Sequence, residues 1–557
     1  MFIDCFENNG GKYLRVVRSI RTTKKDGRKT TKKIPVFNIG PLSKFDDGEP
    51  DYLARLRQSF RDGKPLIPAL LPYVGTESAP QKYVIEYVAG SNYCAASPKR
   101  FAPCILDPTF AALGLDQLFA SIKHSSRIQY DLQGIVRLLT YGRLLEPASK
   151  MATMRQNDSY YQPLVKSSND DHVYDTLDVI YENRQQIIRR MNSCISKGIG
   201  RNTSTVFYDV TNFFFETEQP DEDEVDEEGN VIEKGLRKMG VSKENRKQPI
   251  VQMGLFLDDN GIPISIEMFP GNTLDHLTFR TAMRNTVDIL KLDRFILIAD
   301  RGMYNGTNMC YVLDQGDGYI VSKSLKKSTK KEREWVLDQE GYTVVSPDFR
   351  YKSRIVTRTV SAEDGSKRTI KEKVVIYWSR SFYDSKKLLS MIDDSKLTEF
   401  NELMGYYQIV SSELEMDDLE IIDKYHGLTR IEDQFREMKG TLETRPIWVN
   451  TPEHIQAHLL ICFMALTMMR VIQHKINNSL SDDKAKDLNW SYGLPGARLS
   501  DALRSWQIEQ LSDEYYRMVN IDSDDLKLIL QAYGLDIPLR LFTRGDLRSL
   551  KGSVSVF

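Results

Sequence analysis

Residues 425–439, which read YHGLTRIEDQFREMK, combine two patterns on one predicted helix. Apolar residues recur at steps of three and four, the spacing of a stripe that packs on a core (Leu428, Ile431, Phe435, Met438 and Leu442). Tyr425, Glu432 and Lys439 recur at steps of seven along one edge of that stripe, and Arg436 joins them. A phenol, a carboxylate and two cations beside a buried face predict a functional site. The alternative at this point is a surface helix with ordinary charge pairs.

The composition bounds the class of protein. A chain of 557 residues is too long for one domain, and 41% hydrophobic with 27% charged residues is typical of a soluble globular protein. The six cysteines are scattered without a CxxC pair, which argues against a zinc site and is typical of a reducing cytosol. The N-terminus shows no signal peptide, and the apolar run 459–469 is about half a membrane span, so it predicts a buried core helix. We expect a cytoplasmic protein without a membrane partner.

A densely basic segment lies near the N-terminus. Residues 12–33 hold ten cations and a single acid, Asp26, and two β-prone runs flank the turn sequence KDGR, which predicts a hairpin. A ribbon this basic, in a chain of net charge −1, favours contact with nucleic-acid phosphates. An exposed edge hairpin protected by lysines is the alternative. The predicted DNA-binding residues here are Arg15, Arg18, Arg21, Lys24, Lys25, Arg28, Lys29, Lys32 and Lys33.

The sequence pattern divides the chain into six parts. Residues 1–85 predict the basic hairpin module with a linker, 86–200 a helical domain, and 201–325 with 405–480 a mixed α/β core. Residues 326–404 predict a separate β-rich insertion, and 481–557 a C-terminal tail domain. The acidic run 216–228 is typical of a solvated, mobile loop, although it could also shield a basic groove.

Two carboxylates lie in apolar strands of the predicted core. Asp209 lies within one strand and Asp300 ends another, FILIAD at 295–300. Each alone is equally consistent with a structural aspartate, but strand ends are where α/β sheets place ligands, and a buried carboxylate is costly unless it is paired or bound to metal. With Glu432 on a helix that packs on the sheet, three carboxylates would converge. Oxygen ligands without His or Cys select Mg²⁺ or Mn²⁺, and two such ions about 4 Å apart suit phosphodiester chemistry.

The order of these elements resembles the ribonuclease H-like core of DDE transposases. More narrowly, it resembles the bacterial insertion-sequence group with a β-rich insertion and a Tyr-x2-Arg-x3-Glu-x6-Lys signature, which Tyr425, Glu432 and Lys439 match. The segments YDVTNFFFE, MGVSKENRKQP, PGNTLDH and ADRGMYN also resemble that group, so the match covers roughly 100–480. The signature Arg falls on Leu428. On an ideal helix Arg430 points about 160° from Glu432 and Arg436 about 40°, so Arg436 is the expected substitute.

The resemblance implies a fold, a reaction and partners. The fold would be a ribonuclease H-like mixed α/β sheet with a β-rich insertion, a basic β-hairpin module and a helical domain. Asp209, Asp300 and Glu432 would be catalytic and hold two Mg²⁺ or Mn²⁺ ions, while Tyr425, Arg436, Lys439 and Arg301 would bind DNA. Water would cut the element end, and the freed 3′-hydroxyl would attack target DNA in a cut-and-paste reaction without a covalent enzyme intermediate.

The implied partners are double-stranded DNA, as terminal inverted repeats and as target, and a second copy of the chain in a homodimer, within a bacterial cytoplasm at the nucleoid. In some relatives an aromatic side chain of the insertion stacks on a flipped base, which makes Trp378 and Trp335 candidates, with buried structural tryptophans as the alternative.

Other functions are still open at this point. A metal-dependent nuclease of the same fold would cleave without joining ends, and a domesticated DNA-binding protein would do neither. The presence of Asp209, Asp300 and Glu432 argues against an inactive core. A serine or tyrosine recombinase would form a covalent protein–DNA adduct, which we do not expect.

Overall fold

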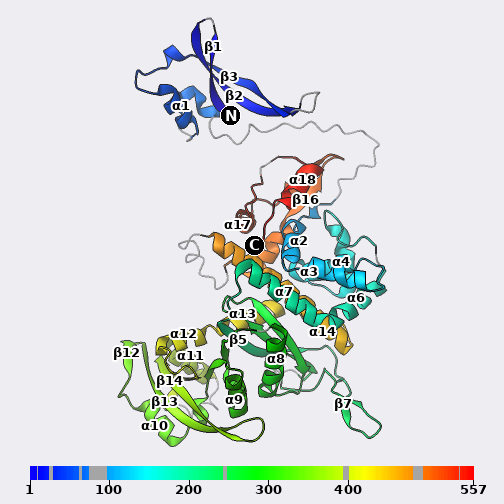
Figure 1. Cartoon of the computed structure of the whole chain (residues 1–557), viewed down its shortest axis with the longest axis vertical. Helices are drawn as coiled ribbons and strands as arrows, with labels where there is room; N and C mark the ends of the chain where they lie inside the picture. The colour runs from blue at the N-terminus through cyan, green and yellow to red at the C-terminus, as the bar shows by residue number, and fades with distance from the viewer. Residues whose placement is uncertain are drawn as a thin grey trace. The chain divides into compact units, whose positions relative to one another are not determined.

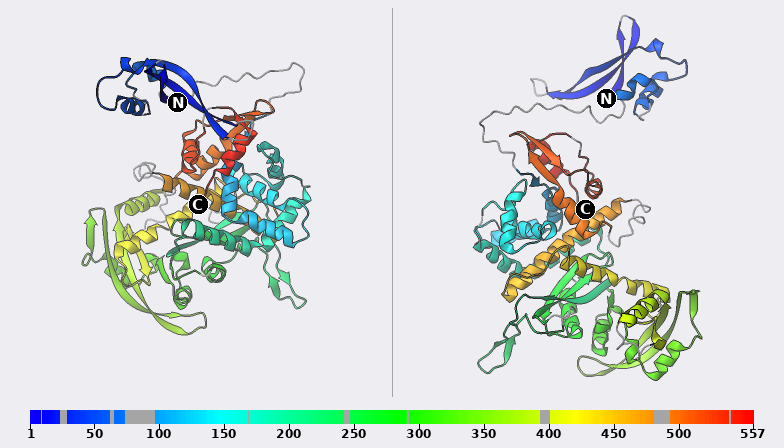
Figure 2. Two further views of the ribbon diagram at one scale, coloured as in Figure 1. Left: turned by 45° about the horizontal axis from the view of Figure 1, so that its top comes forward. Right: turned by 180° about the vertical axis from the view of Figure 1, so that it is seen from behind.

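The computed structural model divides into two compact units, Met1–Asn92 and Tyr93–Phe557 (Figures 1 and 2). It describes residues 1–8, 10–23, 29–61, 65–73, 97–167, 169–241, 247–290, 292–392, 401–480, 493–537 and 540–557. The two units have separate hydrophobic cores. All three candidate catalytic carboxylates belong to the second unit.

The first unit is a three-stranded antiparallel sheet in the order β1-β2-β3, with one helix packed on it. Its elements are β1 (Phe2–Asn8), β2 (Gly11–Thr23), β3 (Lys29–Pro41) and α1 (Tyr52–Arg61). The predicted basic hairpin is confirmed, since β2 and β3 pair antiparallel from Tyr13↔Pro41 to Thr23↔Lys29. The KDGR turn itself lies outside the described residues.

Nine strands of the second unit form one mixed sheet in the order β12-β13-β14-β15-β11-β10-β5-β8-β9. Five of them build the catalytic half: β5 (Thr205–Phe214), β8 (Ile250–Leu257), β9 (Pro263–Pro270), β10 (Ile296–Ala299) and β11 (Gly318–Ser322). The first three are an antiparallel meander, and β10 and β11 run parallel to β5. This order and these directions are those of the predicted ribonuclease H-like fold.

The β-rich segment is not separate from that sheet, contrary to our prediction. It contains β12 (Thr343–Ser346), β13 (Phe349–Ser361) and β14 (Lys367–Ser379), flanked by α10 (Lys330–Leu337) and α11 (Arg380–Ile392). β14 pairs with β15 (Tyr406–Ser411), which in turn pairs with β11. The physical reason lies in β14, where Val374 and Ile376 are buried on one face while Val375 and Tyr377 are buried on the other. A strand with two apolar faces needs cover on both sides, which an interior position supplies.

Two layers cover the sheet (Figure 1). On one face, α8 (Asp275–Leu290) and α9 (Gly306–Asp314) pack with Tyr208 and Ala299 in what we call the α8-side core. On the other face lies the helical-side core, which includes Phe207 and Ile298. It is built from α12 (Asp418–His426), α13 (Thr429–Lys439), α14 (Pro452–Ser479) and the upstream helices α2 (Pro103–Ala112), α3 (Leu115–Ser125), α4 (Leu132–Leu145), α5 (Lys150–Arg155), α6 (Asp171–Glu182) and α7 (Arg184–Ile199).

Helix α14 confirms the buried core helix predicted around 459–469. It is long and apolar enough to cross a membrane, but 94% of its most apolar window is buried inside the structure, as in the core helix of a soluble fold. The C-terminal region adds a four-stranded sheet in the order β18-β17-β16-β4. Its elements are β4 (Lys99–Arg100), α16 (Gly496–Ser505), β16 (Gln507–Gln510), β17 (Tyr515–Val519), α17 (Asp524–Ala532), β18 (Phe542–Thr543) and α18 (Arg544–Gly552).

The acidic run is largely exposed, as the sequence predicted, but it forms an anchored hairpin instead of a loop. Strands β6 (Glu224–Val225) and β7 (Val231–Glu233) pair antiparallel, and the Asp226 carboxylate accepts backbone hydrogen bonds that close the turn. Arg237 pairs with Asp221 at 2.5 Å and Lys238 with Asp223 at 2.6 Å. Arg237 and Lys238 thus neutralise carboxylates at the base of the hairpin. Both cations follow the acidic run in the sequence, so a charge count over the run alone leaves them out.

Candidate active site

The two strand aspartates lie side by side. In the parallel pair formed by β5 and β10, Tyr208 is in register with Ala299, and the next residue on each strand is Asp209 and Asp300. The backbone of Asp300 is still extended, with φ −76° and ψ 166°. Neighbouring strands are about 4.8 Å apart, and residues in register project to the same face. The fold therefore brings together two carboxylates that are 91 residues apart in the sequence.

Side-chain alternation decides which face they use. Phe207 and Ile298, two residues before Asp209 and Asp300 on their strands, belong to the helical-side core. Side chains repeat every two residues in a strand, so both carboxylates project to that face. Helix α13 contacts β5 on the same face and buries Ile431 and Phe435 there, while Glu432 remains exposed beside them. All three carboxylates are thus on one side of the sheet.

The three carboxylates do not form a closed metal cluster in this structure. Among the described residues, no group of three or more His, Cys, Asp or Glu side chains is placed so that it could hold an ion. The available donors are carboxylate oxygens, and the hydroxyls of Ser322 and Tyr425 lie beside them. This all-oxygen set fits a hard divalent cation such as Mg²⁺ or Mn²⁺ and is a poor match for zinc or copper.

Asp300 is oriented by two hydroxyl groups. Its Oδ1 accepts a hydrogen bond from Ser322 Oγ at 3.1 Å and lies 3.5 Å from the Tyr425 hydroxyl. The Tyr425 hydroxyl is 3.0 Å from that of Tyr407. Burial raises the pKa of Tyr425, and Tyr407 adds to the shift, so the phenol remains neutral and can donate.

Tyr425 is only 6% exposed, which places it as a support of Asp300 instead of on a DNA-facing surface as predicted. Ser322 and Tyr407 were missed in the sequence. A signal for Ser322 existed, because Ser322 ends the strand GYIVS in the way that Asp300 ends FILIAD, and Val321 pairs with Ala299. No comparable signal pointed to Tyr407.

The predicted continuous helix over 425–439 is wrong. Helix α12 ends at His426 and α13 begins at Thr429. Across the junction the backbone N–H groups of Leu428 and Ile431 donate to carbonyls three residues back, each at 3.0 Å. Gly427 packs so closely on Phe207 that a Cβ atom would lie 2.7 Å from its ring. The break lets the chain approach β5 while both helices keep their apolar faces on the sheet.

The cations of α13 fall into two groups. Arg430 donates to the backbone oxygen of Asp259, and its guanidinium lies 5.6 Å from the Phe207 ring. Arg436 has a 76% exposed side chain that pairs with Asp433 at 2.8 Å. The predicted difference between the two arginines is therefore seen, with Arg430 tied to the core and Arg436 on the exposed side with Glu432. Lys439 lies 5.8 Å from the Phe213 ring, and Arg301 follows Asp300 and is exposed.

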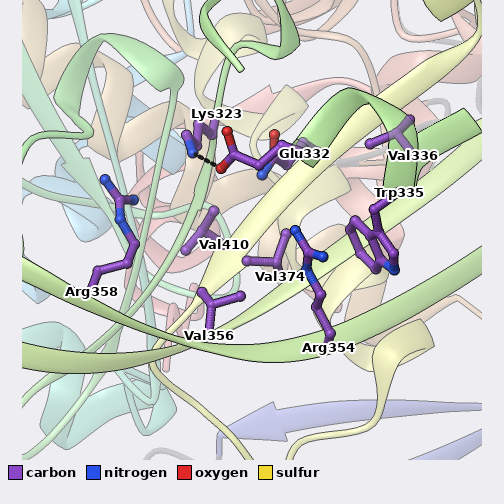
Figure 3. A pocket seen from close by; sticks show the side chains of 10 residues that line it. Lys323, Glu332, Trp335, Val336, Arg354, Val356, Arg358, Val374 and Val410 are labelled. Atoms are coloured by element: carbon purple, nitrogen blue, oxygen red, sulfur yellow. Dashed lines mark hydrogen bonds and ion pairs between the residues drawn. The ribbon is translucent and has the colours of Figure 1, made fainter. Parts of the chain in front are cut away.

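The two candidate stacking tryptophans are already in contact with protein groups. Trp335 has the guanidinium of Arg354 3.9 Å from its ring centre, and both line a cavity of about 100 Å³ together with the ion pair Lys323–Glu332 (Figure 3). Trp378 donates from Nε1 to the backbone oxygen of Met404 at 3.2 Å. Each side chain is half-buried. These contacts favour the structural alternative, because a stacked base would have to displace Arg354 from Trp335.

A buried polar chain holds the segment after α13. Lys150 Nζ donates to His458 Nδ1 at 2.7 Å, and His458 Nε2 is 2.8 Å from the backbone oxygen of Thr444, to which it donates. Burial lowers the pKa of Lys150 to about 7 and lowers that of His458 well below its usual range. At pH above 7 these side chains are therefore largely uncharged, and they link α5, α14 and the segment that leaves the Glu432 helix.

The basic hairpin of the first unit is partly compensated from within. Arg15 and Lys33 both contact the Asp4 carboxylate, at 2.8 and 2.9 Å, and the Lys33 hydrogen bond is the largest cause of the lowered pKa of Asp4. Arg18 is exposed. The side chains of Arg21, Lys24, Lys25, Arg28, Lys29 and Lys32 lie outside the described residues. The described part of the hairpin thus presents Arg18 as an exposed cation and Arg15 and Lys33 as paired ones.

Comparison with known proteins gives a match over the core. A family model described as a transposase DDE domain matches residues 205–468, from β5 with Asp209 to α14 beyond Glu432. No curated protein matches the chain. Among solved structures, a piggyBac transposase synaptic complex with hairpin DNA is 10% identical with a TM-score of 0.36, covering 72% of this chain and 77% of that chain. A Mos1 mariner paired end complex with Mn is 12% identical with a TM-score of 0.14, covering 37% and 57%.

Proposed function

We propose that this chain, whose residues 205–468 match a family model of the transposase DDE domain, is a DDE transposase that moves an insertion-sequence element by a cut-and-paste route. Enzymes of this family are metal-dependent, cleave DNA and transfer its strands. The observation that carries the proposal is the in-register pair Asp209 and Asp300 on the sheet face that the Glu432 helix covers. One carboxylate inside a strand and one at the end of its parallel neighbour, with a third on the covering helix, are suited to phosphodiester cleavage and joining.

Asp209, Asp300 and Glu432 would hold the two divalent ions, Mg²⁺ or Mn²⁺. When bound, such ions supply activation of the attacking oxygen and stabilisation of the leaving oxygen. Ser322 and Tyr425 hold the Asp300 carboxylate in one orientation through its Oδ1 atom. The chain thereby fixes a ligand before the DNA arrives, which lowers the cost of assembling the site.

The cations around this face would position the DNA. Arg436, Lys439 and Arg301 lie on α13 or directly after Asp300 and can neutralise backbone phosphates on either side of the scissile bond. The basic hairpin of the first unit would add affinity for the element ends. We propose that the ends are terminal inverted repeats, that two copies of the chain bridge them as a homodimer, and that the reaction takes place in a bacterial cytoplasm at the nucleoid.

The test uses the full chain and the DNA that flanks its own gene. A donor plasmid with these flanks is incubated with a target plasmid and Mg²⁺, and excised and joined products are sequenced. Wild type should yield joined products with a short target duplication. Cleavage without joining would instead support the nuclease.

Matched variants test the site itself. Asp300→Asn and Glu432→Gln should abolish cleavage while DNA binding stays within about twofold, because each removes a ligand without disturbing packing. Asp293→Asn, at the exposed start of the same strand region, and Asp433→Asn, the neighbour on α13, are the controls and should cleave normally. Normal cleavage by Asp209→Asn, Asp300→Asn or Glu432→Gln would overturn the assignment.

A further inference from the structure

A cavity of about 320 Å³ opens on the C-terminal sheet of the second unit, and we call it the tail pocket. Its cations are Lys99, Arg544 and Arg548, and its aromatic side chains are Tyr161 and Tyr516. No Asp or Glu side chain is among the residues that line it. The C-terminal sheet with β16 and the strand β5 lie on opposite sides of α14 (Figures 1 and 2).

The fold builds this pocket from four segments of the chain, 97–99, 161–162, 508–516 and 544–548. Ile508 on β16 is 1% exposed and Tyr516 on β17 is 3% exposed, so they provide a rigid base. Lys99 lies on β4, which pairs with β16. Arg544 and Arg548 are four residues apart on α18, which places both guanidinium groups on one face of that helix. The cations are thus held by a sheet and a helix instead of by a loop.

The contacts within the pocket orient the cations through neutral groups, and the Asp513 carboxylate acts on Arg544 only as the smallest of the interactions that raise the pKa of Arg544. Arg544 Nε donates to the Tyr516 hydroxyl at 2.9 Å, and the Tyr516 ring meets Tyr161 edge to face at 5.4 Å. Lys99 Nζ donates to the backbone oxygen of Asp158 at 2.5 Å. In the described parts of the chain, no ion pair is seen for Lys99, Arg544 or Arg548.

Neighbouring arginines of the same region differ. Arg504 pairs with Asp501 and Arg517 with Glu509. Asp546, in the first turn of α18, is engaged by the Thr543 cap and Arg540. Like charges four residues apart on a helix repel, so an anion between Arg544 and Arg548 would relieve the repulsion.

We propose that the tail pocket binds a backbone phosphate of DNA, as a contact separate from the catalytic face. Two guanidinium groups and an ammonium match the charge and the hydrogen-bonding capacity of a phosphodiester. The half-buried ring of Tyr161 beside them can pack on the adjoining sugar. The inference rests on the proposed function only in that DNA is the ligand. It extends the DNA footprint to the far side of α14 and gives the tail a role in binding.

The test compares two double variants of the full chain. Arg544→Gln/Arg548→Gln removes the pocket charges, and Arg504→Gln/Arg517→Gln removes two exposed arginines that already have carboxylate partners. Binding to a labelled random-sequence duplex of about 30 base pairs is measured without divalent metal between 50 and 200 mM NaCl. Losing two phosphate contacts should reduce the slope of log K against log salt by about 1.8, roughly 60-fold in affinity at 0.1 M salt. The control pair should keep the wild-type slope.

A lysine variant and a phosphate competitor separate a DNA contact from a structural role or a free-ion site. Arg544→Lys/Arg548→Lys retains the charge and should retain most of the slope, whereas a loss equal to that of the glutamine pair would overturn a charge-based contact. Equal slopes for the glutamine pair and the control pair would also overturn the proposal. If inorganic phosphate binds the wild-type chain but not the glutamine pair, while the DNA-binding slopes of the glutamine pair and the control pair are equal, the pocket is a free-ion site and the DNA assignment fails. A wild-type chain that binds no DNA would refute the proposed function instead.

Discussion

Two arginines on α13 should give opposite results when each is changed to glutamine. Arg430 donates to the Asp259 backbone oxygen and lies against Phe207, whereas Arg436 is largely exposed. Arg430→Gln removes a charge-assisted hydrogen bond and a cation–π contact at a side chain that is 39% exposed, so we expect it to lower the free energy of unfolding by about 1–2 kcal/mol. Arg436→Gln breaks an exposed ion pair and should cost less than about 0.5 kcal/mol.

For DNA binding the order of the two variants should be reversed, with Arg436→Gln having the larger effect and Arg430→Gln the smaller. The Arg436 side chain is 76% exposed and pairs with Asp433 on its own helix, so it can reach a phosphate. Removal of one phosphate contact lowers the slope of log K against log salt by about 0.9. Arg430→Gln should leave that slope unchanged. Urea denaturation at pH 7 gives the stability difference, and fluorescence anisotropy with a short duplex at several salt concentrations gives the slope. A reduced slope for Arg430→Gln together with a normal slope for Arg436→Gln would refute the assignment of phosphate contact to Arg436.

Three further predictions follow from other contacts. Tyr425→Phe removes one hydrogen bond to Asp300 and should slow cleavage about 5–10-fold at unchanged DNA affinity, as single-turnover assays can show; an unchanged rate would contradict its positioning role. The pKa of Lys150 is about 7 in the fold and 10.5 in the unfolded chain, so the unfolded chain binds more protons between these two pH values. The free energy of unfolding of the wild type should therefore rise with pH by roughly 1.4 kcal/mol per unit relative to that of Lys150→Met. Urea denaturation at pH 7 and 9 measures both proteins, and an equal change in their free energies of unfolding between the two pH values would contradict this prediction. Chelation with EDTA should stop cleavage without reducing DNA binding, and Mn²⁺ should restore it.

The sequence was sufficient to predict the half of the fold that depends on local pattern. The strands with Asp209 and Asp300 are continuous apolar runs that a single pass along the chain can detect, and the order of elements then predicts the ribonuclease H-like sheet. The pairing of β14 with β15 could not be predicted from local pattern, because the pairing of strands far apart in sequence depends on which of their faces become buried in the fold. A β-rich segment therefore looked separate although its strands continue the same sheet.

The site was predicted in part for a similar reason. Periodicity places Tyr425 and Glu432 on one edge but does not report how deep each lies, so a buried support was predicted as a DNA contact. One glycine inside a helical pattern is a weak signal, and the break at Gly427 depends on its contact with Phe207 from another strand. Arg430 and Arg436 were separated correctly because their difference is a rotation about one helix axis.

The acidic hairpin at 221–233 has a consequence for how fast the protein could search a genome. Residues 221–233 hold eight carboxylates and no cation, so in a chain of net charge −1 the remaining residues carry +7. A chain of that charge would bind random DNA tightly, and slow dissociation from non-specific sites would limit its search for a specific site. The hairpin offsets that retention without occupying any DNA-binding residue named above. Its removal should lengthen residence on random DNA and delay elution from a heparin column, at the expense of the rate at which rare element ends are found.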